Sequence, residues 1–238
     1  MLVLGMDTST RAGSVALLRG DKVLGEVLVH SGITHSESIL PAASRVFEQS
    51  GIEPDEIDLF AVTVGPGSFT GLRIGVSIIK GLAFGSSRPV AAVSTLEALA
   101  WNFFFSARPV CAMLDAKKGQ VYSALYYFTE DGRPRREGEV VAVEPERLPG
   151  YLPADVILAG EGAVRYENVF LKAFGPESFA PPHLHLIRAS AVAVLGRRLL
   201  EAGETVKAAD LAPVYIRVSE AEQKRAANDQ TACFIKDH

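Results

Sequence analysis

The sequence predicts an α/β protein made of two similar halves, each with the element order β-β-β-α-β-α. Three observations support this fold class. Each half opens with strand-like runs joined by tight turns, each places an aspartate at the end of its first strand, and each follows a later buried strand with a glycine-rich turn. Recurrence of one order of elements along a chain indicates an internal duplication.

The first half begins with three strand-like segments. Residues 2–7 form a short apolar run that ends in an aspartate, and residues 15–19 and 22–29 follow, separated by a Gly-Asp turn. Apolar runs bounded by such turns are typical of antiparallel strands. We therefore expect a three-stranded meander here.

Two helices of the first half are predicted by the pattern of a capping box. Thr34 and Glu37 precede apolar residues at helical spacing, and Gly51 is placed to end that helix. Ser94 and Glu97 open another apolar helix in the same way. A Ser or Thr followed three residues later by Glu supplies partners for unpaired backbone N–H groups at a helix start.

A glycine-rich segment joins the next strand to the remaining helix. The buried strand is expected at residues 59–64, the helix ends near Gly85, and residues 90–93 form the following strand. The connecting segment is neither a Walker A motif nor G-x-G-x-x-G. From the residues alone it is either a tight strand-to-helix turn or a ligand loop, and Phe69 between glycines indicates an exposed apolar contact.

The second half repeats this order. Its strands are expected at residues 110–114, 121–128, 139–143 and 156–159. The first of these again ends in an aspartate, Asp115, the last leads into a glycine turn, and Ser190 is placed to cap an apolar helix that runs to Gly203. The predicted organisation is a first half at residues 1–106, a second at residues 107–217 and a polar tail at residues 218–238.

This duplication resembles the RNase H-like fold of the actin, Hsp70 and sugar-kinase class (ASKHA). In that class the acidic turns and glycine turns face one another across a cleft, where backbone N–H groups can bind phosphate. The residues that would contact a nucleotide are Asp7, Thr8, Ser9, Gly65, Gly67 and Asp115. The alternative is that these turn residues hydrogen-bond only their own backbone.

Charge and hydropathy exclude two classes of function. Lys plus Arg total 24 and Asp plus Glu 28, so a net charge of −4 argues against an independent nucleic-acid-binding protein. No apolar run approaches the roughly 20 residues that cross a bilayer. The N-terminus lacks the basic segment of a secretory signal, so we expect a cytoplasmic protein.

The sequence offers no evident nucleophile or metal site. Cys111 lies in an apolar strand pattern and Cys233 in the polar tail, without the context of a reactive thiol. His183 and His185 follow two prolines and lack a nearby third ligand. We therefore expect neither covalent catalysis nor a bound metal.

Five segments resemble the TsaB (YeaZ) family of bacterial tRNA threonylcarbamoyladenosine biosynthesis. They are residues 4–9, 35–41, 62–75, 114–122 and 213–217, which lie in the family's order along nearly the whole chain. The most specific is Gly-Pro-Gly-Ser-Phe-Thr-Gly-Leu-Arg, which begins at Gly65. The polar tail departs from the family pattern, and we assign it no role.

The resemblance implies a non-catalytic scaffold and activating subunit of the complex that makes N6-threonylcarbamoyladenosine (t6A) at position 37 of tRNA. Its partners would be the catalytic subunit TsaD and, with it, the ATPase TsaE. The resemblance also implies a homodimer when the subunit is alone, contact with tRNA through the complex, and ATP or ADP at the complex interface rather than in the isolated subunit. The alternative is an independent ATPase or peptidase-like enzyme of the same fold.

The resemblance also implies that the reaction centre is missing. TsaD holds its metal with a His-x-x-x-His pair on the helix after the last strand of the first half. Aligned by a shared Leu-Glu, those positions here are Thr95 and Leu99. Neither side chain offers the nitrogen ligand that an imidazole provides, so we expect no catalytic and no metal-binding residues.

In the family the first two helices of the first half contact the partner, and here they correspond to residues 36–50 and 70–84. The residues expected to bind the partner are His35, Ile39, Pro41, Phe69, Leu72, Arg73 and Lys80.

Overall fold

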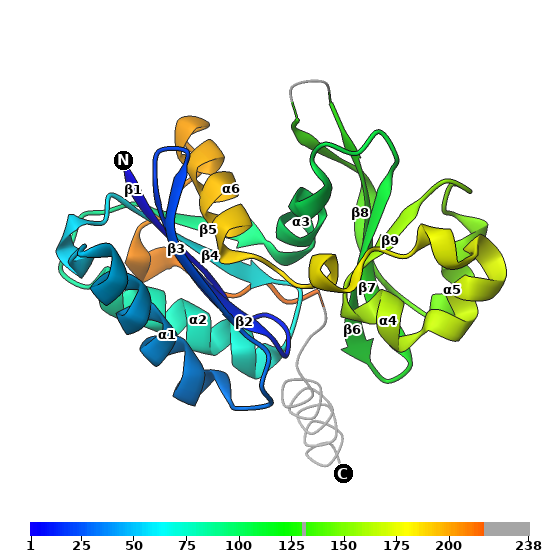
Figure 1. Cartoon of the computed structure of the whole chain (residues 1–238), viewed down its shortest axis with the longest axis horizontal. Coiled ribbons are helices and arrows are strands. Elements are labelled where there is room, and N and C mark those ends of the chain that lie inside the picture. Colours follow the sequence, from blue (N-terminus) through cyan, green and yellow to red (C-terminus); the bar gives the residue numbers. More distant parts are fainter. Residues whose placement is uncertain (130–131, 217–238) are drawn as a thin grey trace, which may run out of the picture.

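The computed structural model describes residues 1–129 and 132–216 and contains two β-sheets flanked by helices (Figure 1). The first sheet has the order β3-β2-β1-β4-β5, in which β1, β2 and β3 are an antiparallel meander and β4 and β5 run parallel to β1. Its strands are β1 (Leu2–Asp7), β2 (Gly13–Arg19), β3 (Lys22–Val29), β4 (Leu59–Gly65) and β5 (Val90–Ser94).

The second sheet repeats this arrangement with the order β8-β7-β6-β9. Its strands are β6 (Val110–Lys117), β7 (Gln120–Phe128), β8 (Pro134–Val143) and β9 (Ile157–Ala159). Here too a meander is extended by a strand parallel to its first member. The predicted duplicated RNase H-like fold is confirmed, although only a 3-10 helix, η3 (Pro145–Gly150), stands between β8 and β9, because two prolines disfavour a longer helix there.

Helices cover both faces of the first sheet (Figure 1). One face packs against α1 (His35–Ser50) and α2 (Phe69–Leu82), and the other against α6 (Ala189–Glu201). Strand β1 is consequently buried at every position, with Leu4 in the α1 and α2 cluster and Val3 in the α6 cluster. A strand covered on both faces has apolar residues throughout, whereas a half-exposed strand alternates apolar and polar residues. The continuous apolar run of residues 2–6 therefore predicts a buried strand.

Helix α6 lies against the first sheet, although the sequence places it in the second half. Small residues allow the close approach: a Cβ atom at Gly196 would overlap the side chain of Ala61 in β4. The chain then stays with the first sheet, where Val206 pairs with Val90. The predicted second half of residues 107–217 is wrong in this respect, and Ser190, the predicted cap, lies within the first turn of α6.

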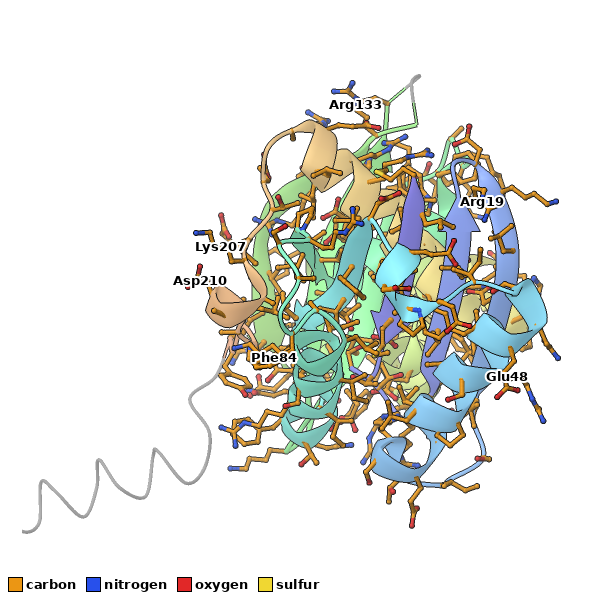
Figure 2. The ribbon with its side chains drawn as sticks, turned by 90° about the vertical axis from the view of Figure 1, so that its left-hand side faces the viewer. Arg19, Glu48, Phe84, Arg133, Lys207 and Asp210 are labelled. Carbon is orange, nitrogen blue, oxygen red and sulfur yellow. The ribbon has the colours of Figure 1, made fainter. Side chains whose placement is uncertain are left out.

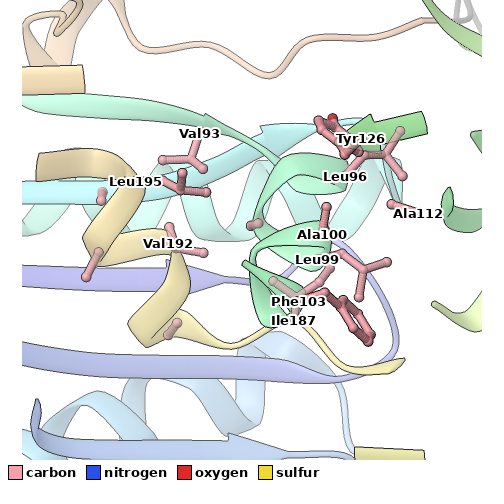
Figure 3. Close-up of a cluster of buried hydrophobic side chains, with 14 of the residues drawn as sticks. Val93, Leu96, Leu99, Ala100, Phe103, Ala112, Tyr126, Ile187, Val192 and Leu195 are labelled. Carbon is pink, nitrogen blue, oxygen red and sulfur yellow. The ribbon is translucent and has the colours of Figure 1, made fainter. Parts of the chain in front are cut away.

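The halves share a hydrophobic core around α3 (Thr95–Ala100) and the 3-10 helix η2 (Trp101–Phe103). Figure 3 shows Leu96, Leu99 and Phe103 on this segment, with Tyr126 of β7 and Leu195 of α6 beside them. The helix therefore joins both sheets into one packed unit.

The remaining helices are short. On the second sheet they are α4 (Glu161–Arg165) and α5 (Glu167–Phe174), and the 3-10 helices are η1 (Pro54–Glu56), η4 (Pro176–Ser178), η5 (Pro182–His185) and η6 (Ala208–Asp210). No described helix is long and apolar enough to cross a membrane.

Neither of the two predicted capping boxes forms as expected. Thr34 and Ser94 do precede their helices, but neither side chain accepts a bond from the helix backbone. The Thr34 hydroxyl instead donates to the Glu37 carboxylate at 2.7 Å. Gly51 ends α1 in the left-handed conformation (φ 66°), as predicted.

Candidate functional site

The turn after β1 is closed around the Asp7 carboxylate. Its Oδ1 accepts hydrogen bonds from the Ser9 amide (3.1 Å), the Ser9 hydroxyl (2.5 Å) and the Thr63 hydroxyl of β4 (2.6 Å). Its Oδ2 is buried without a partner. Burial raises the pKa of Asp7, and the hydrogen bonds from Ser9 and Thr63 offset this only in part.

The glycine-rich segment packs against this turn. A Cβ atom at Gly67 would overlap the Ser9 carbonyl oxygen, and one at Gly71 would overlap that of Thr8. The Ser68 amide donates to the Ser9 carbonyl at 2.7 Å. The backbone of the turn after β1 thus packs directly against Gly67 and Gly71, and these contacts fit a tight strand-to-helix turn.

Asp115 belongs to a separate ion cluster. Its carboxylate accepts hydrogen bonds from the Lys117 amide (3.0 Å) and ammonium (2.7 Å), and Arg165 of α4 lies 3.4 Å away. Burial alone would raise the pKa of Asp115, but Lys117 and Arg165 lower it. The residues predicted to contact a nucleotide therefore do not form one group. Asp7, Thr8, Ser9 and Gly67 pack together, Gly65 packs against the Val214 backbone, and Asp115 is paired within its own half.

Thr95 and Leu99 lie in the core that the two halves share. Both are 0% exposed. The Leu99 Cδ2 atom would lie only 2.6 Å from a Cβ atom at Gly160, so the leucine fills the space beside that turn. Among residues 1–129 and 132–216, no three His, Cys, Asp or Glu side chains lie close enough together to hold a metal ion.

Two of the predicted partner-binding residues are core residues. Ile39 and Leu72 are 0% exposed, so their prediction as surface contacts is wrong. Ile39 lies on the buried stripe of α1 with Ala43 and Val46, and Leu72 is in phase with buried Val76 of α2. Helical periodicity places both on the face that meets the sheet.

The other five partner-binding candidates lie at the surface, and four of them also contact the chain's own backbone or side chains. Pro41 and Arg73 are exposed, and His35, Phe69 and Lys80 are half-buried. His35 Nε2 lies 2.6 Å from the Thr10 carbonyl, and Lys80 donates to the Ala209 carbonyl at 3.0 Å.

The Phe69 side chain packs against Tyr215 of the C-terminal segment, with the two rings tilted by 32°. Its ring centroid lies 4.8 Å from the ring centroid of Tyr215. The Cζ atom of Arg73 lies over the Phe69 ring, 3.7 Å from its centroid. Arg73 also donates to the Tyr215 hydroxyl at 3.1 Å. The predicted exposed apolar contact at Phe69 is therefore partly covered by the chain itself.

The structure adds surface residues that the sequence analysis did not identify. Helix α2 exposes Thr70, Ser77 and Gly81 along one stripe, and Phe84 after its end is 89% exposed. Leu40 of α1 is 49% exposed. Figure 2 shows α1 and α2 side by side at the surface, with Phe84 at the end of α2. The exposed residues of α1 and α2, together with Phe84, are called the two-helix face below.

Comparison with known proteins identifies the family. The chain matches the family model of TsaD, tRNA N6-adenosine threonylcarbamoyltransferase, over residues 30–224. It is 31% identical over 234 residues to the tRNA threonylcarbamoyladenosine biosynthesis protein TsaB of Bacillus subtilis (strain 168), covering 94% of this chain and 97% of that protein. The chain belongs to the TsaB family. The resemblance found in five sequence segments is thus confirmed.

Further TsaB proteins agree with this assignment. The protein from Escherichia coli (strain K12) is 32% identical over 236 residues, covering 94% of this chain and 98% of its own length. The crystal structure of YeaZ from Pseudomonas aeruginosa, 31% identical, superposes with a TM-score of 0.76 over 90% of this chain and all of that chain. The similarity therefore includes both sheets.

Proposed function

We propose that this chain is a non-catalytic scaffold and activating subunit in the synthesis of t6A at position 37 of tRNA in the cytoplasm. It binds the transferase subunit TsaD and, with it, TsaE. Support comes from its TsaB relatives, which are named tRNA threonylcarbamoyladenosine biosynthesis proteins, and from its match to the TsaD family model.

The observation that carries the proposal is the burial of Thr95 and Leu99. By the resemblance, matched at the shared Leu-Glu, these residues stand where the transferase would have its metal-binding histidines, and here both side chains are fully buried. A hydroxyl and an aliphatic chain in a packed core supply neither imidazole nitrogens nor room for substrate. The fold is retained while the reaction centre is replaced by hydrophobic packing.

The two-helix face supports a binding role. Its stripe of small residues on α2 allows another helix to approach closely, and Leu40 and Phe84 offer apolar area that association would bury. A stable interface usually buries about 1,200–2,000 Å² in total. We expect the same face to pair two copies of the subunit when the transferase is absent, so that homodimer and heterodimer exclude each other.

A matched pair of surface variants tests this function. Ser77→Arg places a long cation on the two-helix face, and Ala173→Arg makes the same kind of change at an exposed position of α5. We expect Ser77→Arg to abolish co-purification with the transferase subunit and the formation of t6A in a reconstituted reaction, while Ala173→Arg retains both. Equal assembly of the two variants, or t6A formation by this chain unaided, contradicts the proposal.

A further inference from the structure

A polar pocket lies where the two halves meet, away from the turns after β1 and β6. Its volume is about 470 Å³, within the range of small-ligand sites. Glu97 of α3 comes from the first half, and the other lining residues come from β7 and β8 of the second. They are Tyr126, Pro134, Arg136, Gly138 and Glu139.

A bulge in β8 shapes one wall of this pocket. Ser123 of β7 pairs with Val141 and Leu125 pairs with Glu137, so residues 138–140 stand opposite Ala124 alone. Gly138 takes the left-handed conformation (φ 71°) that this irregularity requires. Bulges re-aim side chains, and this one brings Glu139 to the same pocket as Glu97.

The Glu97 carboxylate is half-buried in the pocket and makes no hydrogen bond or ion pair within the described part of the chain. Burial raises the pKa of Glu97, and the charges of Arg136 and Arg198 offset this in part, while Glu204 adds to it. A half-buried carboxylate loses part of its hydration, and no donor among the described residues replaces it here. A ligand with donor groups would restore it.

The neighbouring arginines bind groups other than Glu97. Arg136 donates to the Gly138 carbonyl at 3.0 Å and to Glu139 at 3.4 Å. Arg198 donates to the Gly132 carbonyl at 3.4 Å and lies 4.4 Å from the Trp101 ring centroid. Two carboxylates line the pocket, and Arg136 neutralises Glu139. Among the described lining residues, the Glu97 carboxylate therefore has no cation paired with it, which favours a cationic ligand.

We propose that this pocket binds an ammonium or guanidinium group, with Glu97 as the acceptor. The cation belongs either to a small amine or to a lysine or arginine side chain of a partner protein. Because the pocket walls come from both halves, binding also ties the halves together. The inference does not depend on the scaffold function, since the isolated chain contains the whole site.

Titration of the isolated chain with agmatine, which carries both kinds of cation, tests the site. We expect saturable shifts of the backbone amide NMR signals of Glu97, Tyr126 and Gly138, and none with the uncharged analogue butylurea. Glu97→Gln should weaken binding by about tenfold or more, equivalent to about 1.4 kcal/mol. The control Glu144→Gln removes the same charge at an exposed residue paired with Arg147 and should bind like the unmodified chain.

The proposed site is wrong if agmatine causes no saturable shifts, or if Glu97→Gln binds agmatine with the same affinity as the unmodified chain. A melting temperature that is not lowered in Glu97→Gln shows that a loss of binding is not a loss of folding. The source of the cation is decided separately. If agmatine displaces the transferase subunit from the unmodified chain, the cation belongs to that partner, and if assembly is unaffected the site takes a small amine.

Discussion

The Thr8 hydroxyl donates a hydrogen bond to the carbonyl oxygen of Gly71, 2.8 Å away, and joins the turn after β1 to the first turn of α2. Both residues are buried. The bond therefore holds the turn and the glycine-rich segment to each other. The glycines of this segment are therefore expected to matter for stability rather than for ligand binding.

Alanine substitutions along α2 separate these roles. At Gly75 a Cβ atom would overlap the Thr8 hydroxyl oxygen, so Gly75→Ala should lower the free energy of unfolding by about 1–3 kcal/mol. Gly81 is exposed and has open space around it, so Gly81→Ala should raise that free energy by about 0.5–1 kcal/mol. Urea denaturation measures both values. A lower free energy of unfolding in Gly81→Ala would show that other atoms pack against Gly81 and that this part of α2 is not open to solvent.

Neighbouring residues of α2 should differ strongly in their effect on folding. Leu72→Ala removes a fully buried side chain and should cost about 2–5 kcal/mol of unfolding free energy. Arg73→Ala removes an exposed guanidinium that rests on Phe69, and should cost about 1 kcal/mol or less. Thermal unfolding compares the two. A loss of partner binding in a Leu72 variant would report damaged folding, so surface contact is better tested at Arg73.

Much of the fold was predictable because its signals are local. Both meanders are bounded by tight turns, and Gly51 ends α1 where the apolar spacing stops. The apolar spacing of α2 also predicts that Leu72 is buried, because Leu72 lies one turn from Val76 on the same helix face.

Other features depend on contacts between distant parts of the chain. Helix α6 packs on the first sheet because Gly196 fits against Ala61, and neither small residue indicates its partner when read alone. The aromatic contact of Phe69 with Tyr215 likewise joins residues far apart in the chain, so neither residue predicts it from its own surroundings in the sequence. For the glycine-rich segment the residues alone leave a turn and a ligand loop open, because its contacts with the turn after β1 join residues far apart in the chain.

The buried Asp7 carboxylate should make stability depend on pH. Because burial raises its folded-state pKa above the ordinary value of 3.8, the unfolded chain loses this proton first as the pH rises. The contribution of Asp7 to the free energy of unfolding therefore falls as the pH rises from about 3.8 through the folded-state pKa. Asp7→Asn should remove this decline, as measured by urea denaturation across the acidic range.

The same variant bears on function. A scaffold subunit needs no charge at Asp7, so Asp7→Asn should still support t6A formation by the reconstituted complex. An enzyme that used this carboxylate to bind a magnesium nucleotide would lose activity. Loss of t6A formation by a stably folded Asp7→Asn protein would therefore favour the alternative of an independent ATPase.

Glu26 of β3 should show the opposite dependence on pH, because it is well paired. Its Oε1 accepts hydrogen bonds from the Ser190 amide (3.0 Å) and hydroxyl (2.9 Å), and Arg188 donates to Oε2. Burial alone would raise the pKa of Glu26, but these donors lower it below the ordinary value of 4.5. The contribution of this cluster to stability is fully present above about pH 4.5 and is lost as the pH falls through the folded-state pKa.

Glu26→Gln tests this link between the first sheet and the start of α6. It should lower the free energy of unfolding by about 1–3 kcal/mol at neutral pH, because the donors of Arg188 and Ser190 lose their charged acceptor. The difference from the unmodified chain should shrink as the pH falls from about 4.5 through the folded-state pKa of Glu26, below which the native carboxylate is also neutral. Glu48→Gln, at an exposed position of α1, serves as the control and should change little at either pH. A deficit in Glu26→Gln that stays constant under acid would mean that shape rather than charge holds α6 to the sheet.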